Sequence, residues 1–194
     1  MKCFRNAILV IACVSIGYAA LGQQQSFRAS TPEIDNAFVQ KQFGPSCSLI
    51  GMAPVIADMD GDGVDDAVIP ARCTNPMIDQ AQFTFRVIDP YYSFFGYGNP
   101  KVTLMYSTQE PERRGFVLLM IHGSGPEAWR STTPKAKFVI VNLPFKDISV
   151  KRLAVRKKTV MGVYIEETGG DQLVSVVYFD GKKYKYQPMG STLE

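Results

Sequence analysis

The sequence predicts a mainly β fold, with antiparallel sheets in a meander and one short N-terminal helix. Three observations support this prediction. After Cys47, apolar runs of about four to eight residues alternate with turn residues to the end of the chain. Only the segment before Cys47 combines a helix start with a helical apolar period. The chain has 194 residues, 46% of them hydrophobic, which is enough for one substantial core.

The N-terminus has the pattern of a signal peptide. Lys2 and Arg5 precede an apolar run over residues 7–20, and Ala20-Leu21-Gly22 supplies small residues for cleavage before Gln23. We therefore expect a signal peptide over 1–22, a single β-rich domain over 23–194, and a secreted or periplasmic location. An uncleaved anchor and a lipidated Cys13 are the minority alternatives, and only they would attach the chain to a membrane.

The charge balance makes nucleic acid an unexpected partner. The formal net charge is +3, and removal of Lys2 and Arg5 with the signal peptide leaves +1. Nucleic-acid-binding domains usually carry a strong basic excess. We therefore do not expect this chain to bind nucleic acid.

Two cysteines, Cys47 and Cys73, remain after the signal peptide is removed. In an oxidising compartment such a pair usually forms a disulfide, which here would join the two sides of an acidic segment. Two free buried thiols or an intermolecular link are the alternatives. A cysteine-based zinc site lacks ligands, because the chain has one histidine.

The helix is predicted to begin at Ser30-Thr31-Pro32-Glu33, where a hydroxyl cap, a proline and an acid stand in sequence. Ile34 and Phe38 fall on one face, and Gly44-Pro45 ends the run. We expect this helix to pack on a sheet.

The remaining elements are predicted to be strands, several of them joined as hairpins. Residues 160–173 form one hairpin, and Asp180-Gly181 supplies the tight turn of a second. Residues 146–158 hold six basic residues and suggest a strand with a solvated basic face, with contact to an anionic cell-surface polymer as the functional alternative. The other predicted strands are Leu49–Ala57, Ala67–Ala71, Gln82–Ile88, Lys101–Tyr106, Phe116–Ile121, Lys137–Val141, Val160–Glu166, Leu173–Phe179 and Lys183–Tyr186.

The segment from Asp58 to Asp66 has the spacing of a calcium loop. Counted from Asp58, carboxylates stand at positions 1, 3, 5 and 9, glycine at position 6, and a backbone carbonyl is offered at position 7. Alternate residues of a loop wrapped around an ion point inward, and glycine permits the sharp turn. Hard oxygen ligands in this number suit Ca²⁺. The predicted ligands are Asp58, Asp60, Asp62, Asp66 and the Val64 carbonyl; a solvated acidic turn is the alternative.

The flanks of this loop exclude the helix-loop-helix form of calcium site. Position 12 is Ile69, where that form places a bidentate Glu. Pro54 precedes the loop and Pro70 follows it, and both sides are predicted as short strands. The expected arrangement is therefore strand, calcium loop, strand.

The segment Pro54–Ala71 resembles the calcium loop of FG-GAP and VCBS-type repeats. Those repeats carry an Asp-x-Asp/Asn-x-Asp-Gly-x-x-Asp run before a short apolar strand, and they usually form β-propeller blades of extracellular proteins. The resemblance implies calcium ligation by the same five residues and a blade-like hairpin. The motif occurs once in this chain, whereas propellers repeat it from blade to blade.

No catalytic constellation is visible. Val117–Pro126 resembles the His-Gly oxyanion strand of α/β-hydrolases, but the chain has no Gly-x-Ser-x-Gly elbow and its only histidine is His122. We expect a buried strand that ends in a Gly-Pro loop.

An aromatic segment follows the acidic loop and is flanked by prolines. Such a loop could stack on sugar rings or anchor a protein partner, and it could equally pack over the end of a sheet. Its residues, which form the possible binding surface, are Tyr91, Tyr92, Phe94, Phe95 and Tyr97.

The sequence therefore predicts a calcium-stabilised binding or structural module that is not an enzyme. Its partner would be an extracellular protein or a carbohydrate. One alternative is an extracellular hydrolase that uses other carboxylates, namely Asp89, Glu110, Glu112 or Glu127. The other is an inhibitor or adhesion accessory protein whose contact surface is the aromatic segment.

Overall fold

A computed structural model describes residues 33–96, 113–143, 145–168 and 173–191 of this chain. The chain divides into two compact units, Met1–Thr31 and Pro32–Glu194, and all described residues belong to the second. The expected signal peptide, Cys13, Tyr97 and the expected strand Lys101–Tyr106 lie outside the described residues. Within the second unit the prediction of a mainly β fold with antiparallel sheets is confirmed.

The first sheet, sheet A, contains six strands: β1 (Cys47–Leu49), β2 (Val55–Ala57), β3 (Asp66–Cys73), β4 (Arg86–Ile88), β5 (Phe116–His122) and β6 (Ala136–Ile140). Their order is β1-β3-β5-β6-β4, and β2 also pairs with β3. The pairs are antiparallel except β4 with β6, which is parallel.

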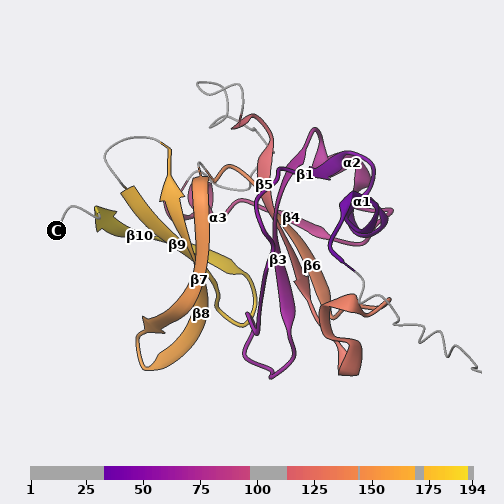
Figure 1. Cartoon of the computed structure of the whole chain (residues 1–194). Coiled ribbons are helices and arrows are strands. Elements are labelled where there is room, and N and C mark those ends of the chain that lie inside the picture. Colours follow the sequence, from indigo (N-terminus) through magenta and orange to yellow (C-terminus); the bar gives the residue numbers. More distant parts are fainter. Residues whose placement is uncertain (1–32, 97–112, 144, 169–172, 192–194) are drawn as a thin grey trace, which may run out of the picture. The chain divides into compact units, whose positions relative to one another are not determined.

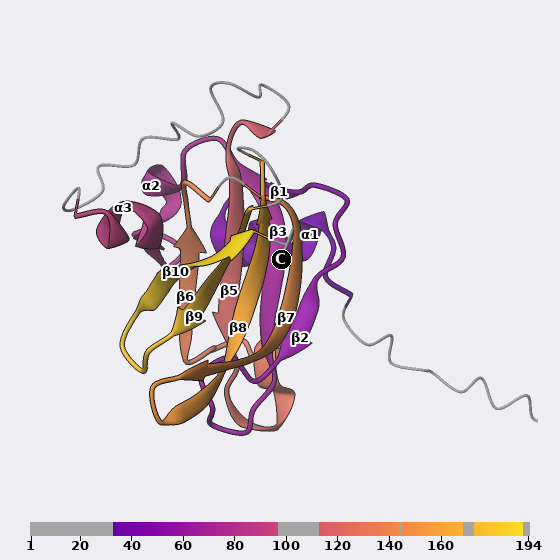
Figure 2. The same ribbon diagram turned by 90° about the vertical axis from the view of Figure 1, so that its left-hand side faces the viewer.

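The second sheet, sheet B, is the predicted C-terminal meander. Its strands are β7 (Phe145–Val155), β8 (Lys158–Glu167), β9 (Leu173–Phe179) and β10 (Tyr184–Ser191), in the order β10-β9-β8-β7. All three pairs are antiparallel, so both predicted hairpins are present. Figure 2 views this sheet from its outer side.

Sheet A is buried on both faces. Along β5, Val117, Leu119 and Ile121 point into one cluster, which holds helix residues, and Leu118 and Met120 point into another, which holds side chains of sheet B. This alternation follows from the two-residue period of a strand. Figure 1 shows the resulting layers, with sheet A between sheet B and α1. The continuous apolar run of β5 is explained by burial on both of its sides.

Helix α1 (Asn36–Phe43) begins later in the chain than predicted. Asp35 is the N-cap, and its Oδ1 accepts a hydrogen bond from the Phe38 N–H, at 2.7 Å. A side chain that accepts a hydrogen bond from a free N–H of the first turn favours a helix start at that point. The helix therefore begins after Asp35 and not at Pro32. The helix ends at Gly44 as predicted, and Val39 and Phe43 pack on sheet A. The other helical segments are α2 (Pro76–Asp79), α3 (Pro90–Phe94) and a 3-10 segment, Gly125–Arg130.

Two predicted strands are shorter than expected. Residues 49–57 form the end of β1 and all of β2, separated by a bend at Gly51, whose φ is 81°, and by Pro54. Only the last three residues of the predicted strand 82–88 are extended, because Thr84 takes a φ of 50° in a turn. Positive φ values interrupt a strand.

The predicted Cys47–Cys73 disulfide is present and crosses the β1–β3 pair, in which the two cysteines are direct partners. Both are fully buried. Within the described part of the chain, no helix has the length and apolar character needed to cross a membrane.

Candidate metal site

The acidic loop connects β2 to β3, which are antiparallel neighbours in sheet A. Ala57 pairs with Asp66, so residues 58–65 form the connection of a hairpin. The strand-loop-strand arrangement predicted from the sequence is therefore present. The loop leads into the start of β3. The end of β5 and the start of β6 lie at the same edge of the sheet.

Asp58 organises the first half of the loop. Its Oδ1 accepts hydrogen bonds from the N–H groups of Gly61 and Asp62, at 2.7 and 3.1 Å, and its Oδ2 accepts one from Gly63 at 2.9 Å. Gly61 and Gly63 both have φ near 80°. A non-glycine residue is strained at such angles, which explains glycine at these positions.

Asp66 anchors the other end of the loop inside the protein. It is 1% exposed, and its two oxygens accept hydrogen bonds from the N–H groups of Met59, at 2.8 Å, and Gly123, at 2.7 Å. A side chain at residue 123 would collide with the Asp65 carbonyl and with the 128–129 backbone, so glycine permits this close approach.

Asp60 is nearly as buried, and its two oxygens have different surroundings. The Oδ2 atom lies 2.7 Å from Lys135 Nζ and 3.3 Å from His122 Nδ1. The Oδ1 atom is buried and accepts no hydrogen bond from any described residue. The side chain as a whole is 3% exposed. A buried carboxylate oxygen without a partner is costly, and its presence in a fold calls for an explanation.

Asp62 is held by different contacts. Its Oδ1 accepts a hydrogen bond from the Val64 N–H at 2.9 Å, and its Oδ2 lies 2.8 Å from Lys135 Nζ. The Lys135 ammonium thus bridges Asp60 and Asp62, which raises the pKa of Lys135 and lowers that of Asp62.

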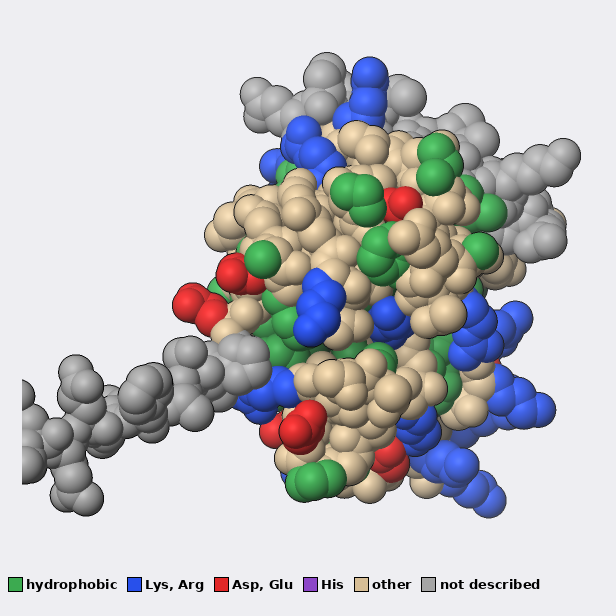
Figure 3. All heavy atoms as spheres, turned by 90° about the vertical axis from the view of Figure 1, so that its right-hand side faces the viewer, with side chains coloured by type: hydrophobic (Ala, Val, Ile, Leu, Met, Phe, Trp, Pro, Cys, Tyr) green, Lys and Arg blue, Asp and Glu red, His purple; other side chains and the backbone are tan. Residues whose placement is uncertain are grey.

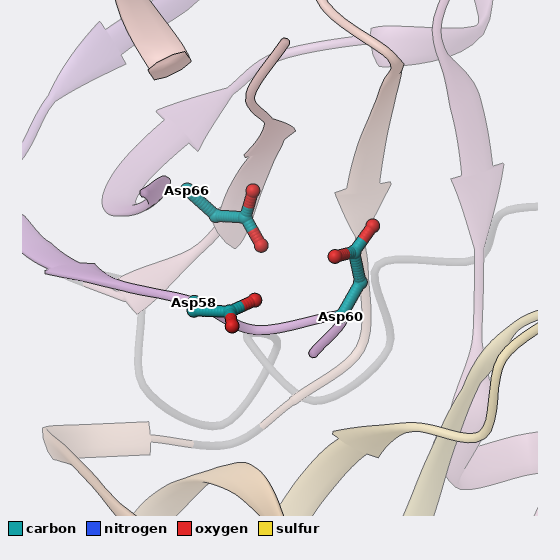
Figure 4. A group of neighbouring side chains, drawn as sticks. All are labelled: Asp58, Asp60 and Asp66. Carbon is teal, nitrogen blue, oxygen red and sulfur yellow. The ribbon is translucent and has the colours of Figure 1, made fainter. Parts of the chain in front are cut away.

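Three of the four predicted carboxylate ligands come together. One carboxylate oxygen from each of Asp58, Asp60 and Asp66 lies within 4.8 Å of the others, close enough to hold one metal ion. Figure 4 shows the three carboxyl groups pointing toward one another. Asp62 stands outside this group. The backbone carbonyl of Val64 has no described contact that places it in the site.

The surroundings of Asp66 oppose its ionised form in the absence of a cation. Burial raises the pKa of Asp66 to about 6, against the hydrogen bonds from Gly123 and Met59, which lower it. The charges of Asp60 and Asp58 raise it further. Like charges at such distances repel by about 1 kcal/mol in water and by more where water is excluded.

His122 connects the acidic loop to sheet B. Its Nδ1 faces Asp60, and its Nε2 lies 2.7 Å from the Tyr184 hydroxyl oxygen of β10. Its ring also packs against Phe138 and Phe179. Burial lowers the pKa of His122, while the charge of Asp60 raises it. The histidine is a buried link between a carboxylate and a tyrosine at the end of the predicted buried strand.

Sequence reasoning missed Gly123, His122 and Lys135 as neighbours of the loop. Their signals were weak: His122-Gly123 ends an apolar strand, and Lys135 precedes the next one. Strand β5 pairs with β3 and β6 pairs with β5, so all three residues reach the loop through sheet topology.

The aromatic segment forms a short helix against sheet B. Asp89 caps α3 by accepting a hydrogen bond from the Tyr92 N–H. The Tyr91 ring centroid lies 5.0 Å from that of Tyr186 on β10, and the rings of Phe94 and Phe95 lie within 6.3 Å of the same tyrosine. Phe94 and Phe95 are each 50% exposed, so the segment both packs over the sheet and presents apolar surface. Its role in binding stays a prediction.

Of the carboxylates suggested for a hydrolase, the structure describes Asp89 and Glu127, whose surroundings differ. Asp89 is buried, caps α3 and accepts a hydrogen bond from Asn142, while Glu127 is exposed. Glu110 and Glu112 lie outside the described residues.

A hollow of about 470 Å³ on sheet B is lined by two other acids, Asp147 and Glu166. Glu166 pairs with Lys146 at 2.7 Å, and Asp147 accepts a hydrogen bond from the Ile148 N–H. The ion pair occupies one of the two carboxylates, so this hollow does not form a free acid–base pair.

No protein-family model matches this chain, and comparisons with curated proteins and with solved structures found no similar protein.

Proposed function

We propose that this chain is an exported calcium-binding β domain that acts as a binding or structural module, with the ion serving as a clasp for the β2–β3 loop. The observation that carries the proposal is the Asp60 Oδ1 atom, which is buried, lacks a hydrogen-bond partner among the described residues, and belongs to a group of three converging carboxylates. A bound cation would satisfy this oxygen and neutralise its neighbours.

The donor set fits calcium. Asp58, Asp60 and Asp66 offer only carboxylate oxygens, and Ca²⁺ takes six to eight oxygen ligands in flexible geometry, part of them from water and backbone carbonyls. In this proposal the three carboxylates hold the ion. Asp62 and the Val64 carbonyl remain candidates for its further ligands. Lys135 Nζ contacts the Oδ2 atoms of Asp60 and Asp62. When bound, the ion would supply positive charge to the converging carboxylates as well.

The surroundings of the group support a structural role. Asp58 and Asp66 already accept five backbone hydrogen bonds between them, so an ion held by their carboxylates would fix the loop backbone. The resemblance of Pro54–Ala71 to the calcium loop of FG-GAP and VCBS-type repeats supports the same interpretation.

Export is part of the proposal. The Cys47–Cys73 disulfide is consistent with an oxidising compartment, and the signal-peptide pattern over 1–22 supports secretion or a periplasmic location. We propose an extracellular protein or a carbohydrate as the partner.

The test is thermal unfolding of the mature chain in millimolar Ca²⁺, in millimolar Mg²⁺ and in a chelator. A ligand that binds only the native state at a hundred times its Kd stabilises it by about 2.7 kcal/mol, so Tm should rise in Ca²⁺ and fall in chelator. Identical melting curves in Ca²⁺ and in chelator would contradict the proposal.

Two variants make the test specific to the site. Asp60→Ala should abolish the Tm gain from Ca²⁺ and leave a cooperatively folded protein in chelator. Asp65→Ala removes the same charge from an exposed neighbour outside the group and should keep the gain. An equal loss in both variants would show that only the general acidity of the loop matters.

A further inference from the structure

Two hairpin turns lie at the same end of sheet B. Strand β8 pairs with β9 through Gly162 and Tyr178, so the β7–β8 turn, after Val155, and the β9–β10 turn, after Phe179, are at the same end of the sheet. Figure 2 shows both turns at the lower left. We call residues 151–158 and 180–185 the basic tips.

The basic tips hold a large share of the positive charge of the chain. They contain eight basic residues and a single acid, Asp180, whereas the chain as a whole has a net charge of +3. The basic residues are Lys151, Arg152, Arg156, Lys157, Lys158, Lys182, Lys183 and Lys185. In Figure 3, which views the molecule from the opposite side to Figure 2, Lys and Arg side chains gather at the lower right.

Most of these charges have no counter-ion among the residues that the structure describes. Lys185 lies 3.7 Å from Asp180, and Lys151 lies over the Tyr164 ring. The other six are exposed and form no ion pair with any residue that the structure describes. Like charges on neighbouring residues repel one another, and a negatively charged partner would relieve this repulsion.

The two turns differ in how their backbones are held. In the β9–β10 turn, Asp180 Oδ1 accepts hydrogen bonds from the N–H groups of Lys182 and Lys183, both at 2.9 Å. In the β7–β8 turn, Arg156 takes a φ of 54°. An ordered turn loses less conformational entropy on binding than a flexible one, which favours binding at Lys182 and Lys183.

The chemistry of the tips distinguishes between anionic partners. Membrane-surface binders add exposed apolar side chains that enter the lipid, and single-stranded nucleic acid is bound by exposed aromatic rings on which bases stack. None of the large exposed hydrophobic residues among the described part of the chain lies in the tips. The charges extend over two hairpins, which suits a partner with repeated negative groups.

We propose that the basic tips bind an acidic polysaccharide, a hydrated polymer that carries sulfate or carboxylate groups along its length. This inference rests on the proposed function as a binding module and names the class of its partner. It does not require the calcium site, because no described contact joins the side chains of Arg156, Lys157 or Lys158 to the acidic loop.

The experiment measures binding of the mature, calcium-loaded chain to heparin, as the probe polyanion, and to uncharged dextran at 50 mM salt. The first variant is Arg156→Asn/Lys157→Ser/Lys158→Thr, in which Asn tolerates the positive φ of residue 156. The second is Lys182→Ser/Lys183→Ser, in which the backbone hydrogen bonds to Asp180 are kept. The matched control is Lys41→Ser/Arg114→Ser/Lys146→Ser, which removes as many charges as the first variant, all of them from exposed positions outside the tips.

The wild type should bind heparin and not dextran, and binding should weaken as salt rises. The first variant should raise the Kd on the order of tenfold, and the control by much less, because only the former removes adjacent unpaired charges. Equal losses in the first variant and the control would overturn the proposal, as would tighter binding to anionic phospholipid vesicles or to single-stranded DNA than to heparin.

The Tm gain from Ca²⁺ is measured on the same variants, and it separates this proposal from the previous one. Both tip variants should retain the gain. If the gain is retained while heparin binding is absent in the wild type, the polysaccharide proposal fails and the calcium proposal stands.

Discussion

The acidic loop and the basic tips both concentrate charge of one sign, yet the protein treats them in opposite ways. In the loop, Asp60 and Asp66 are turned inward, are at most 3% exposed, and receive backbone and ammonium contacts. In the tips, Lys157, Lys158 and their neighbours point into solvent without counter-ions among the described residues. Burial, rather than local charge density, separates a group that could hold an ion from a surface that can meet a partner.

The largest difference between the two regions should appear when one buried carboxylate is removed. Asp66→Ala leaves the N–H groups of Met59 and Gly123 without their side-chain acceptor and removes one of the proposed metal ligands. Each orphaned buried donor costs about 1–3 kcal/mol, so the free energy of unfolding in Ca²⁺ should fall by about 4 kcal/mol. Urea unfolding measures this loss. Asp65→Ala, the exposed neighbour, should change it by less than about 1 kcal/mol, and equal losses would remove the distinction between buried and exposed acids.

The next largest effect concerns the disulfide that joins β1 to β3 and closes the segment that carries the acidic loop. The described residues of sheet B contain no such cross-link. The Cys47–Cys73 disulfide spans 26 residues. Closure of a chain of this length stabilises the folded state by about 3 kcal/mol, so Cys47→Ala/Cys73→Ala should lower the free energy of unfolding by about that amount. The same double substitution should leave heparin binding by the folded protein unchanged. A parallel loss of heparin binding would show that the two regions are coupled.

A smaller effect should follow from pH through the Asp66 carboxyl of the loop. The pKa of Asp66 in the metal-free fold is about 6, above its ordinary value of 3.8. The folded state therefore binds the proton more tightly than the unfolded state, and in chelator this carboxyl should add stability as pH falls from about 7 to about 4. In Ca²⁺ the proton competes with the ion, so the Tm gain from Ca²⁺ should shrink below pH 6. Melting curves from pH 5 to pH 8 measure both trends, and Asp66→Asn, which cannot titrate, should lack the rise in chelator.

The smallest effect on stability should come from the basic tips. Lys182→Ser/Lys183→Ser removes two exposed side chains that form no described ion pair. Such substitutions usually change the free energy of unfolding by no more than about 0.5 kcal/mol, and the relief of repulsion favours a slight gain. A loss of more than about 1 kcal/mol in thermal or urea unfolding would mean that the tips are structural.

Local sequence patterns were sufficient for much of the fold. The alternation of apolar runs and turns predicted the meander, and Asp180-Gly181 predicted the turn between β9 and β10, because strand period and turn chemistry depend on neighbouring residues. The cysteine pair and the register of Asp58, Asp60 and Asp66 were also readable, since each needs only spacing along the chain. Helix α1 began later than predicted because Asp35 and the Ser30–Thr31 pair offer competing caps, and the choice depends on packing against sheet A.

By itself, then, the sequence determined a β-rich chain with one disulfide pair and one acidic loop of metal-binding spacing. Only the tertiary structure decided which groups surround that loop. Gly123 reaches Asp66 across 57 residues, and Lys135 reaches Asp60 across 75. Contacts over such separations are set by the order of strands in a sheet, which short-range patterns do not encode. For the same reason, only the pairing of β8 with β9 placed the two basic turns at one end of sheet B.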